Sequence, residues 1–266
     1  MAGLTKEADR HVDAVLAALD VLDSFLSTPS MTAKQLAEHT GLTRNRVIRL
    51  TGTLLHRGYL MRDEEHNAYL PGPRIRLLNK AFEDAHGIVL LVRPILKHIV
   101  QKTGETASMF VRDGWERVVV AREEGPQAIR YSAPEGQHMD LHAGAAGKVL
   151  LAFASEETVD EFLSNARLLK RTDQTITNAL DLKKEMAKIR RHGFAESCGE
   201  RNVDAAAVSA PVFDGTRSLV GALSIAGPLN RFSKDNRKFY ATIILDAAKK
   251  LSAQLSENPE RLKKEI

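Results

Sequence analysis

Hydrophobic residues between positions 31 and 60 recur at intervals of three to four, with one break at Gly41. This spacing predicts two short helices joined by a tight turn, because residues three and four apart share one face of a helix. Thr32 and Thr43 stand where the helices would begin, and threonine is a common N-cap residue. The predicted inward positions of the first helix are Ala33, Leu36 and Ala37. Those of the second are Val47, Leu50 and Leu54, with Ile48 and Leu55 widening the stripe.

The second predicted helix carries a basic face opposite its apolar stripe. Arg44, Asn45 and Arg46 occupy its first turn, and Arg49 follows. Arginine and asparagine can each make two hydrogen bonds to base edges in the major groove. The pattern therefore predicts a helix-turn-helix that reads DNA; the alternative is a helical hairpin with a solvated basic face. Arg46 is expected to contribute as well, with phosphate as a possible partner in place of a base.

A hairpin is predicted directly after this motif, with strands at 59–62 and 68–70 around a polar tip. It would form the wing of a winged helix. From 41 to 62 the sequence contains five arginines and no acidic residue, although the whole chain carries a formal charge of only +4. The positive field is therefore local to the proposed DNA face. The candidate DNA-binding residues are Thr32, Thr43, Arg44, Asn45, Arg46, Arg49 and Arg62.

Further helices are predicted on both sides of the winged helix. One covers residues 5–26 and is rich in acidic residues. Its predicted apolar face comprises Val12, Val15, Leu16, Leu19, Leu22 and Phe25. The run Pro71-Gly72-Pro73 marks a boundary, after which helical patterns cover 74–86 and 88–102. The first of these would link two domains.

The rest of the chain predicts mixed helices and strands. Strands are expected at 106–112, 115–122, 127–133, 205–213 and 218–226, and Asp-Gly pairs at 113–114 and 214–215 would close two hairpins. Helices are expected at 142–154, 155–169, 181–192 and 233–255. The apolar face of the last helix would comprise Phe239, Ile243, Leu245 and Leu251.

These elements predict an α+β chain of two domains, and 266 residues are enough for both. Residues 5–70 would form the winged helix-turn-helix and 71–87 the linker helix. Residues 88–256 would form an α/β domain with a mostly antiparallel sheet, suited to sensing a small ligand. Residues 257–266 would be a polar tail.

The segment MDLHAGAAGKVLLA at 139–152 is the main candidate for ligand chemistry in the second domain. Its small residues let the backbone approach a ligand, and the helix start would offer free N–H groups to a small carboxylate. The alternative is a Gly/Ala-rich helix start packed closely on the sheet. A phosphate loop is excluded, since His142 and Val149 replace the glycine and the serine or threonine of that motif. Lys148 is expected to be exposed in preference to binding an anion.

Other reactive residues give weaker indications. Cys198 is the single cysteine, so an intrachain disulfide is excluded, and an apolar filling role is favoured over thiol chemistry. His138 and His142 are four residues apart, but Asp140 and Leu141 between them lie in an expected loop and no H-E-x-x-H pattern surrounds them, so we expect no metal site. We expect no cofactor. An enzyme is disfavoured, because no nucleophile, base and orienting group occur at a recognisable spacing. No apolar run reaches the length of a membrane span and the N-terminus does not resemble a signal peptide, so we expect a cytoplasmic protein.

Several blocks in order make the chain resemble the IclR family of bacterial transcriptional regulators over nearly its full length. The first is TAKQLAEHTGLTRNRVIRL at 32–50, followed by Tyr69, Leu70 and Gly72. The others are TGETA at 103–107, LHAGAAGK at 141–148, APVFD at 210–214 and LSIAGP at 223–228.

The resemblance implies a winged helix-turn-helix followed by a GAF-like domain that binds a small organic acid or aromatic catabolite. It also implies dimers joined mainly through the DNA-binding domains, and often tetramers. By this resemblance, and with Met139 added from the segment above, the effector-binding residues are Met139, Gly144, Ala145, Ala146, Ser197, Cys198, Asp204, Ala207, Ser224 and Ala226.

The sequence departs from the family pattern at three of the matched positions. Asp204 stands where the family usually has glycine, and Ala207 and Ala226 replace polar or thiol side chains that hold a small carboxylate in some members. These changes leave room for a larger, more apolar ligand.

We therefore expect a ligand-responsive regulator of a catabolic operon that binds a palindromic operator in double-stranded DNA, more as repressor than as activator. The alternatives are a DNA-binding protein with a vestigial sensor pocket and, less favoured, a small-molecule enzyme.

Overall fold

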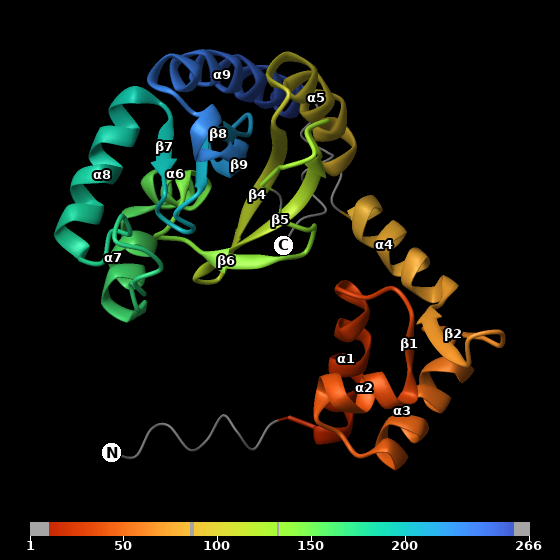
Figure 1. Cartoon of the computed structure of the whole chain (residues 1–266). Coiled ribbons are helices and arrows are strands. Elements are labelled where there is room, and N and C mark those ends of the chain that lie inside the picture. Colours follow the sequence, from red (N-terminus) through yellow and green to blue (C-terminus); the bar gives the residue numbers. More distant parts are fainter. Residues whose placement is uncertain (1–10, 86–87, 132, 258–266) are drawn as a thin grey trace, which may run out of the picture. The chain divides into compact units, whose positions relative to one another are not determined.

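The computed structural model describes residues 11–85, 88–131 and 133–257. The chain divides into two compact units, Met1–Asp84 and Ala85–Ile266 (Figure 1). The expected helical positions 5–10 and 86 and most of the expected polar tail lie outside the described residues. Among the described residues, no helix is long and apolar enough to cross a membrane.

The first unit is a winged helix. Its helices are α1 (Asp13–Asp23), α2 (Ala33–Thr40), α3 (Arg44–His56) and α4 (Pro73–Ala85), with a 3₁₀ turn at Ser24–Leu26. Its strands are β1 (Met31–Thr32), β2 (Leu60–Asp63) and β3 (Ala68–Pro71). They form an antiparallel sheet in the order β1-β3-β2. The predicted motif and wing are confirmed, and β1 is an additional strand.

Local capping sets the helix-turn-helix geometry. The Thr32 side chain accepts from the Gln35 backbone N–H, and the Gln35 side chain accepts from the Thr32 backbone N–H at 2.8 Å, which completes a capping box. Gly41 ends α2 with φ of 70°, the left-handed conformation that glycine adopts without a steric cost. The Thr43 hydroxyl then accepts from the Arg46 N–H and caps α3. The sequence predicted both threonine caps and the turn at Gly41, and the return hydrogen bond from Thr32 to Gln35 is an addition.

The core of this unit corrects two predicted apolar faces. Its buried members are Val21, Phe25, Met31, Leu36, Val47, Leu54, Leu60 and Tyr69. In α1 the buried helix residues are Ala17 and Val21, whereas Val12, Val15, Leu16 and Leu19 are exposed. In α3 the predicted inward residue Ile48 is 46% exposed, and Thr51 is buried in the core in its place. Thr51 is accommodated because its hydroxyl donates to the Val47 carbonyl at 2.9 Å.

The second unit is a six-stranded sheet between two helical layers. Each pair of neighbouring strands in this sheet is antiparallel. Its order is β6-β5-β4-β9-β8-β7. The strands are β4 (Thr106–Asp113), β5 (Glu116–Glu123), β6 (His138–Asp140), β7 (Ala195–Cys198), β8 (Ala205–Phe213) and β9 (Leu219–Pro228). The helices are α5 (Ile88–Thr103), α6 (Ala145–Ala152), α7 (Glu156–Asn165), α8 (Ala179–His192) and α9 (Lys234–Glu257), with a 3₁₀ turn at Leu229–Arg231.

Alternation along the strands divides this unit into two cores. Met109, Val208, Leu223 and Ile225 pack on α5 and α9, and Phe110, Val119, Ala207 and Ala222 pack on α6, α7 and α8. Figure 1 shows α5 and α9 together on one side of the sheet and α6 on the other. Both faces of the sheet are therefore covered, and the α6 side brings the glycine-rich segment against the strands.

Three further predictions for this unit need correction. The expected strand at 127–133 is not formed by its described residues, and β6 takes the place beside β5. In α9 the predicted Leu251 is buried, but Phe239 is 52% exposed, and the buried face also includes Tyr240, Ile244 and Leu255. Lys148 is buried, because every residue of α6 is buried between the sheet and α8. Both Asp-Gly hairpins are confirmed, since β4 pairs with β5 and β8 with β9.

Candidate functional site

The predicted DNA-binding residues divide into exposed side chains and side chains with structural partners. Arg44, Asn45 and Arg49 lie on the exposed face of α3, which Thr43 starts. The hydroxyls of Thr32 and Thr43 accept backbone hydrogen bonds as caps, so their local role is to position the helices. The α3 face therefore presents two arginines and one asparagine of the kind that reads base edges.

Two further arginines of this set are held by their neighbours. Arg46 donates from Nη2 to the Asp13 carbonyl of α1 at 3.2 Å, which ties α3 to α1. Arg62 in the wing donates to Asn67 Oδ1 at 2.7 Å and lies 6.0 Å from the Tyr69 ring centroid. Both side chains are nevertheless exposed.

Part of the predicted effector set meets on the α6 side of the sheet. Register pairs Ser197 with Ala207 and Ala207 with Ala226, so these three positions form one cross-strand row. Ser224 lies two residues along β9, where its hydroxyl is 2.8 Å from that of Ser209. Met139, Ala145 and Ala146 are buried in the same core.

Two predicted positions lie apart from this group. Cys198 alternates to the other face of β7 and packs against the core formed with α5 and α9. Burial raises the pKa of its thiol. Asp204 is exposed on the loop before β8.

The start of α6 is occupied by a side chain of this chain. Gly144 has φ of 95°, and its N–H donates to Glu200 Oε2 at 3.0 Å. The other oxygen of Glu200 accepts from Lys148 Nζ at 2.6 Å. The sequence predicted N–H groups available to a ligand here, and Glu200 takes one of them, the N–H of Gly144.

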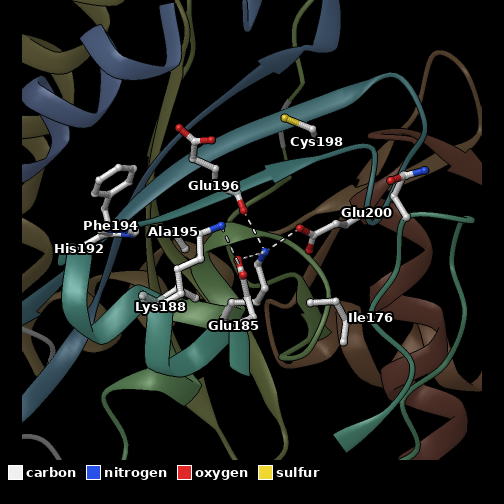
Figure 2. Close-up of a pocket in the computed structure, with 12 residues that line it drawn as sticks. Ile176, Glu185, Lys188, His192, Phe194, Ala195, Glu196, Cys198 and Glu200 are labelled. Atoms are coloured by element: carbon white, nitrogen blue, oxygen red, sulfur yellow. Dashed lines mark hydrogen bonds and ion pairs between the residues drawn. The ribbon is translucent and has the colours of Figure 1, made fainter. Parts of the chain in front are cut away.

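Lys148 is 1% exposed and has acceptors for all three of its N–H bonds. Besides Glu200, it donates to the Glu196 carbonyl at 2.8 Å and to Glu185 Oε1 at 3.2 Å. In Figure 2 the carboxylates of Glu185 and Glu200 are directed toward one another, and dashed lines join them to the ammonium group between them. A groove of about 500 Å³ lies beside these side chains, between α8 and β7. Of the predicted effector residues, the groove includes Cys198. The buried pair explains why glutamate occurs at position 200 and lysine at 148.

A second cavity, of about 290 Å³, contains Met139 from the predicted set. Its other lining residues are polar or charged: Glu116, Tyr131, His138, Asp140, Arg171, Arg201 and Asn202. We call this cavity the arginine pocket. Asp140 forms a two-point ion pair with Arg171, at 2.7 and 3.0 Å, which lowers the pKa of the Asp140 carboxyl. The Asp140 charge is therefore already compensated.

Arg117 lies next to this pocket, and the sequence did not predict it as a site residue. It is 4% exposed and pairs with Met139 across β5 and β6. Its Nη1 donates to the carbonyls of Asp140 and Ala143, and its Nε has no hydrogen-bond partner among the described residues. Burial, and then repulsion by Arg201, lower the pKa of Arg117 to about 10. A signal was present, because Arg117 lies two residues before Val119, which is buried in the core on the α6 side of β5.

The arrangement around Arg117 favours an anion. Its guanidinium is buried against two backbone carbonyls, while the nearby carboxylates of Asp140 and Glu200 bind Arg171 and Lys148. A buried cation that lacks its own carboxylate partner is costly, and a nearby anion reduces that cost. Among the described residues, no group of His, Cys, Asp and Glu side chains is arranged to hold a metal ion.

The winged helix with an exposed basic α3, followed by an α/β unit with a charged pocket, defines a DNA-binding regulator with a sensor-type domain. Residues 14–64 match the model of the IclR helix-turn-helix domain, and residues 81–253 match that of the bacterial transcriptional regulator IclR C-terminal domain. The chain belongs to the IclR family of transcriptional regulators. The resemblance in sequence is thereby confirmed.

Two curated relatives span nearly the whole chain. It is 30% identical to the HTH-type transcriptional regulator BhcR of Paracoccus denitrificans, over 94% of this chain and 90% of that one. It is 28% identical to the transcriptional repressor IclR of Escherichia coli, over 93% of this chain and 92% of that one.

Solved structures agree with this fold. The Thermotoga maritima IclR structure matches with a TM-score of 0.81 at 28% identity, covering 92% of this chain and all of that one (100%). An IclR homologue from Microbacterium hydrocarbonoxydans, solved with 4-hydroxybenzoate, matches with a TM-score of 0.77 at 21% identity, over 92% and 100% of the two chains.

Proposed function

We propose that this regulator reads a palindromic operator with α3 and represses transcription until a small organic anion binds its second domain. The observation that carries the proposal is the exposed, acid-free face of α3 with Arg44, Asn45 and Arg49. A recognition helix inserts its first turns most deeply into the major groove, which is where these residues lie. Repression is favoured because a relative similar over most of its length is a repressor. Since it acts on operator DNA, we assign it to the cytoplasm.

We assign the effector site to the arginine pocket, which includes Met139 of the predicted set. Its volume of about 290 Å³ is near the lower end for small-molecule sites and suits a compact acid. Arg201 lines the pocket and Arg117 lies next to it, so a carboxylate would gain from both charges. The homologue that binds 4-hydroxybenzoate supports an aromatic acid as one probe.

Arg201→Gln is expected to weaken binding of an acidic effector by about tenfold or more, since a hydrogen bond to a charged group contributes more than a neutral one. The measurement is thermal unfolding of the full chain with 4-hydroxybenzoate and a panel of aliphatic and aromatic acids. Acids that bind should raise the melting temperature by mass action, and 4-hydroxybenzamide should not. Arg191→Gln on the exposed side of α8 serves as the matched control. An equal shift in wild type and Arg201→Gln would reject this assignment, and no shift with any acid would favour a vestigial pocket.

We further propose that α1 joins two copies of the chain. Val12, Val15, Leu16 and Leu19 recur at helical spacing and are 44–64% exposed, so they form an apolar stripe on the surface of the first unit. A palindromic operator requires two recognition helices in fixed register, and a homodimer supplies them. The further association of dimers into a tetramer is part of the same proposal.

Combining Val15→Glu with Leu19→Glu should produce monomers, because two charges per copy would have to be buried in the interface. Light scattering after size-exclusion chromatography measures the mass. Operator affinity should fall more than tenfold, since two linked half-site contacts bind far more strongly than one. Leu180→Glu is a matched control, as Leu180 is 65% exposed on α8. Dimers of unchanged mass in the double variant would exclude this face.

The regulatory function is tested by operator binding with and without an acid that stabilises the protein. Fluorescence anisotropy of a labelled operator should show lower affinity in the presence of that acid. Unchanged affinity would mean that the ligand does not control DNA binding, and higher affinity would indicate activation or co-repression.

A further inference from the structure

Gly52 occupies an exposed position on α3 that the fold does not require to be glycine. A side chain carbon added at Gly52 would meet nothing within 4 Å, and its φ is not in the left-handed range. Glycine inside a helix destabilises it relative to alanine. The chain therefore accepts a less stable helix at this place with no benefit from its own packing.

Ile48 lies four residues before Gly52, which is about 6 Å along the helix axis. It is 46% exposed and does not belong to the hydrophobic core of its unit, whereas Thr51 on the other side of α3 is buried. An aliphatic side chain thus stands on the exposed face of α3, one helical turn from Arg44 and one from Gly52. Packing within the first unit explains neither residue.

We propose that Ile48 and Gly52 are specificity-determining residues of the DNA-reading face. Ile48 contacts the 5-methyl group of a thymine, and Gly52 lets the α3 backbone approach the groove at a distance that a Cβ atom would prevent. The inference rests on the proposed role of α3 in reading an operator.

The chemistry of the groove supports this pairing. Thymine is the base that displays a methyl group at the floor of the major groove, and apolar side chains contact it. The polar neighbours Asn45 and Arg49 can satisfy hydrogen-bonding edges, which Ile48 cannot. The stripe from Arg44 through Ile48 to Gly52 therefore combines polar contacts, an apolar contact and a close backbone approach.

Gly52→Ala separates stability from binding. The melting temperature should rise by about 2–6 °C, because alanine favours the helix. The affinity of the full chain for its operator should fall by about tenfold or more. A rise in stability with unchanged affinity would overturn the close approach, and Gly52→Ser, which adds a similar Cβ, should weaken binding as well.

Single thymines of the operator half-site are replaced in turn by deoxyuridine, which lacks only the methyl group. At one position, loss of the methyl should weaken wild-type binding by roughly three- to fivefold, as expected for one apolar carbon removed from a contact. Ile48→Ala should bind thymine and deoxyuridine equally at that position, and its melting temperature should stay near that of wild type. If the variant retains the full discrimination, or wild type shows none, Ile48 does not contact a methyl group.

Arg49→Ala on the same operator distinguishes the role of α3 in reading DNA from the roles of Ile48 and Gly52. Weaker binding by Arg49→Ala together with wild-type behaviour of the Ile48 and Gly52 variants would leave α3 as the reading helix and reject only this pair. Unchanged binding by all of these variants would reject the α3 face itself.

Discussion

Replacing both Arg44 and Arg49 with alanine is expected to lower operator affinity on the order of 100-fold or more. Each bidentate arginine–guanine contact is worth about 1–3 kcal/mol, and contacts to separate bases add approximately. Both side chains are exposed, so their removal should leave the melting temperature of the protein nearly unchanged. The measurement is a competition titration with operator and with scrambled DNA of the same length at constant salt.

The controls separate base reading from general charge. Arg191→Ala removes one positive charge from the second unit and should have little effect. Arg46→Ala should weaken binding to operator and to scrambled DNA to a similar degree, because we expect Arg46, which is hydrogen-bonded to the Asp13 carbonyl, to contact a phosphate. Unchanged operator affinity in Arg44→Ala, Asn45→Ala and Arg49→Ala alike would reject the proposed face.

Glu200→Ala is expected to destabilise the second unit by about 3–5 kcal/mol, the usual range when one member of a buried ion pair is removed. The substitution takes the closest carboxylate from Lys148, which is 1% exposed, and the acceptor from the Gly144 N–H. Glu185, 3.2 Å from the same ammonium, remains as partial compensation. Urea unfolding followed by Trp115 fluorescence reports on this unit, since Trp115 is the single tryptophan and its ring lies 5.9 Å from that of Phe162.

Two variants test the cause of this loss. Glu185→Ala should cost less, because its side chain is 20% exposed and water can replace part of the interaction. Lys148→Met combined with Glu200→Leu should recover most of the stability, since apolar residues of similar size often replace a buried ion pair without loss. A single Glu200→Ala variant as stable as wild type would show that the pair has no structural role.

The sequence predicted those parts of the fold that depend on neighbouring residues. The capping threonines, Gly41 and the Asp-Gly turns act within a few positions of themselves, so their structural effect is visible in the sequence. The helical spacing of apolar residues in α3 was equally clear, but it did not show which edge of the apolar face is buried. Ile48 therefore appeared to be inward, because an aliphatic residue at a margin is usually buried and a threonine is not.

Long-range partners account for what the sequence did not predict. The Lys148 ammonium can be buried because Glu185 and Glu200 accept its hydrogen bonds. These residues lie 37 and 52 positions along the sequence, and only the fold brings them next to Lys148. The arginine pocket likewise joins β5, β6, the segment before α8 and the loop after β7. In the first helix the sequence predicted an inward stripe that includes Val12, Val15, Leu16 and Leu19, whereas the core uses Ala17 and Val21. Their packing depends on α2 and α3, which sequence periodicity alone cannot locate.

The reading of a specific operator by α3 is tested most directly by selection from fragmented genomic DNA of the cell that encodes this chain. Wild-type protein and the Arg44→Ala/Arg49→Ala variant are each incubated with the fragments at physiological salt, and the retained DNA is sequenced. We predict that wild type enriches a small number of fragments that share a palindrome, and that the variant loses this enrichment. Equal enrichment by both proteins, or retention without a shared sequence, would contradict the assignment of α3 as the reader of an operator.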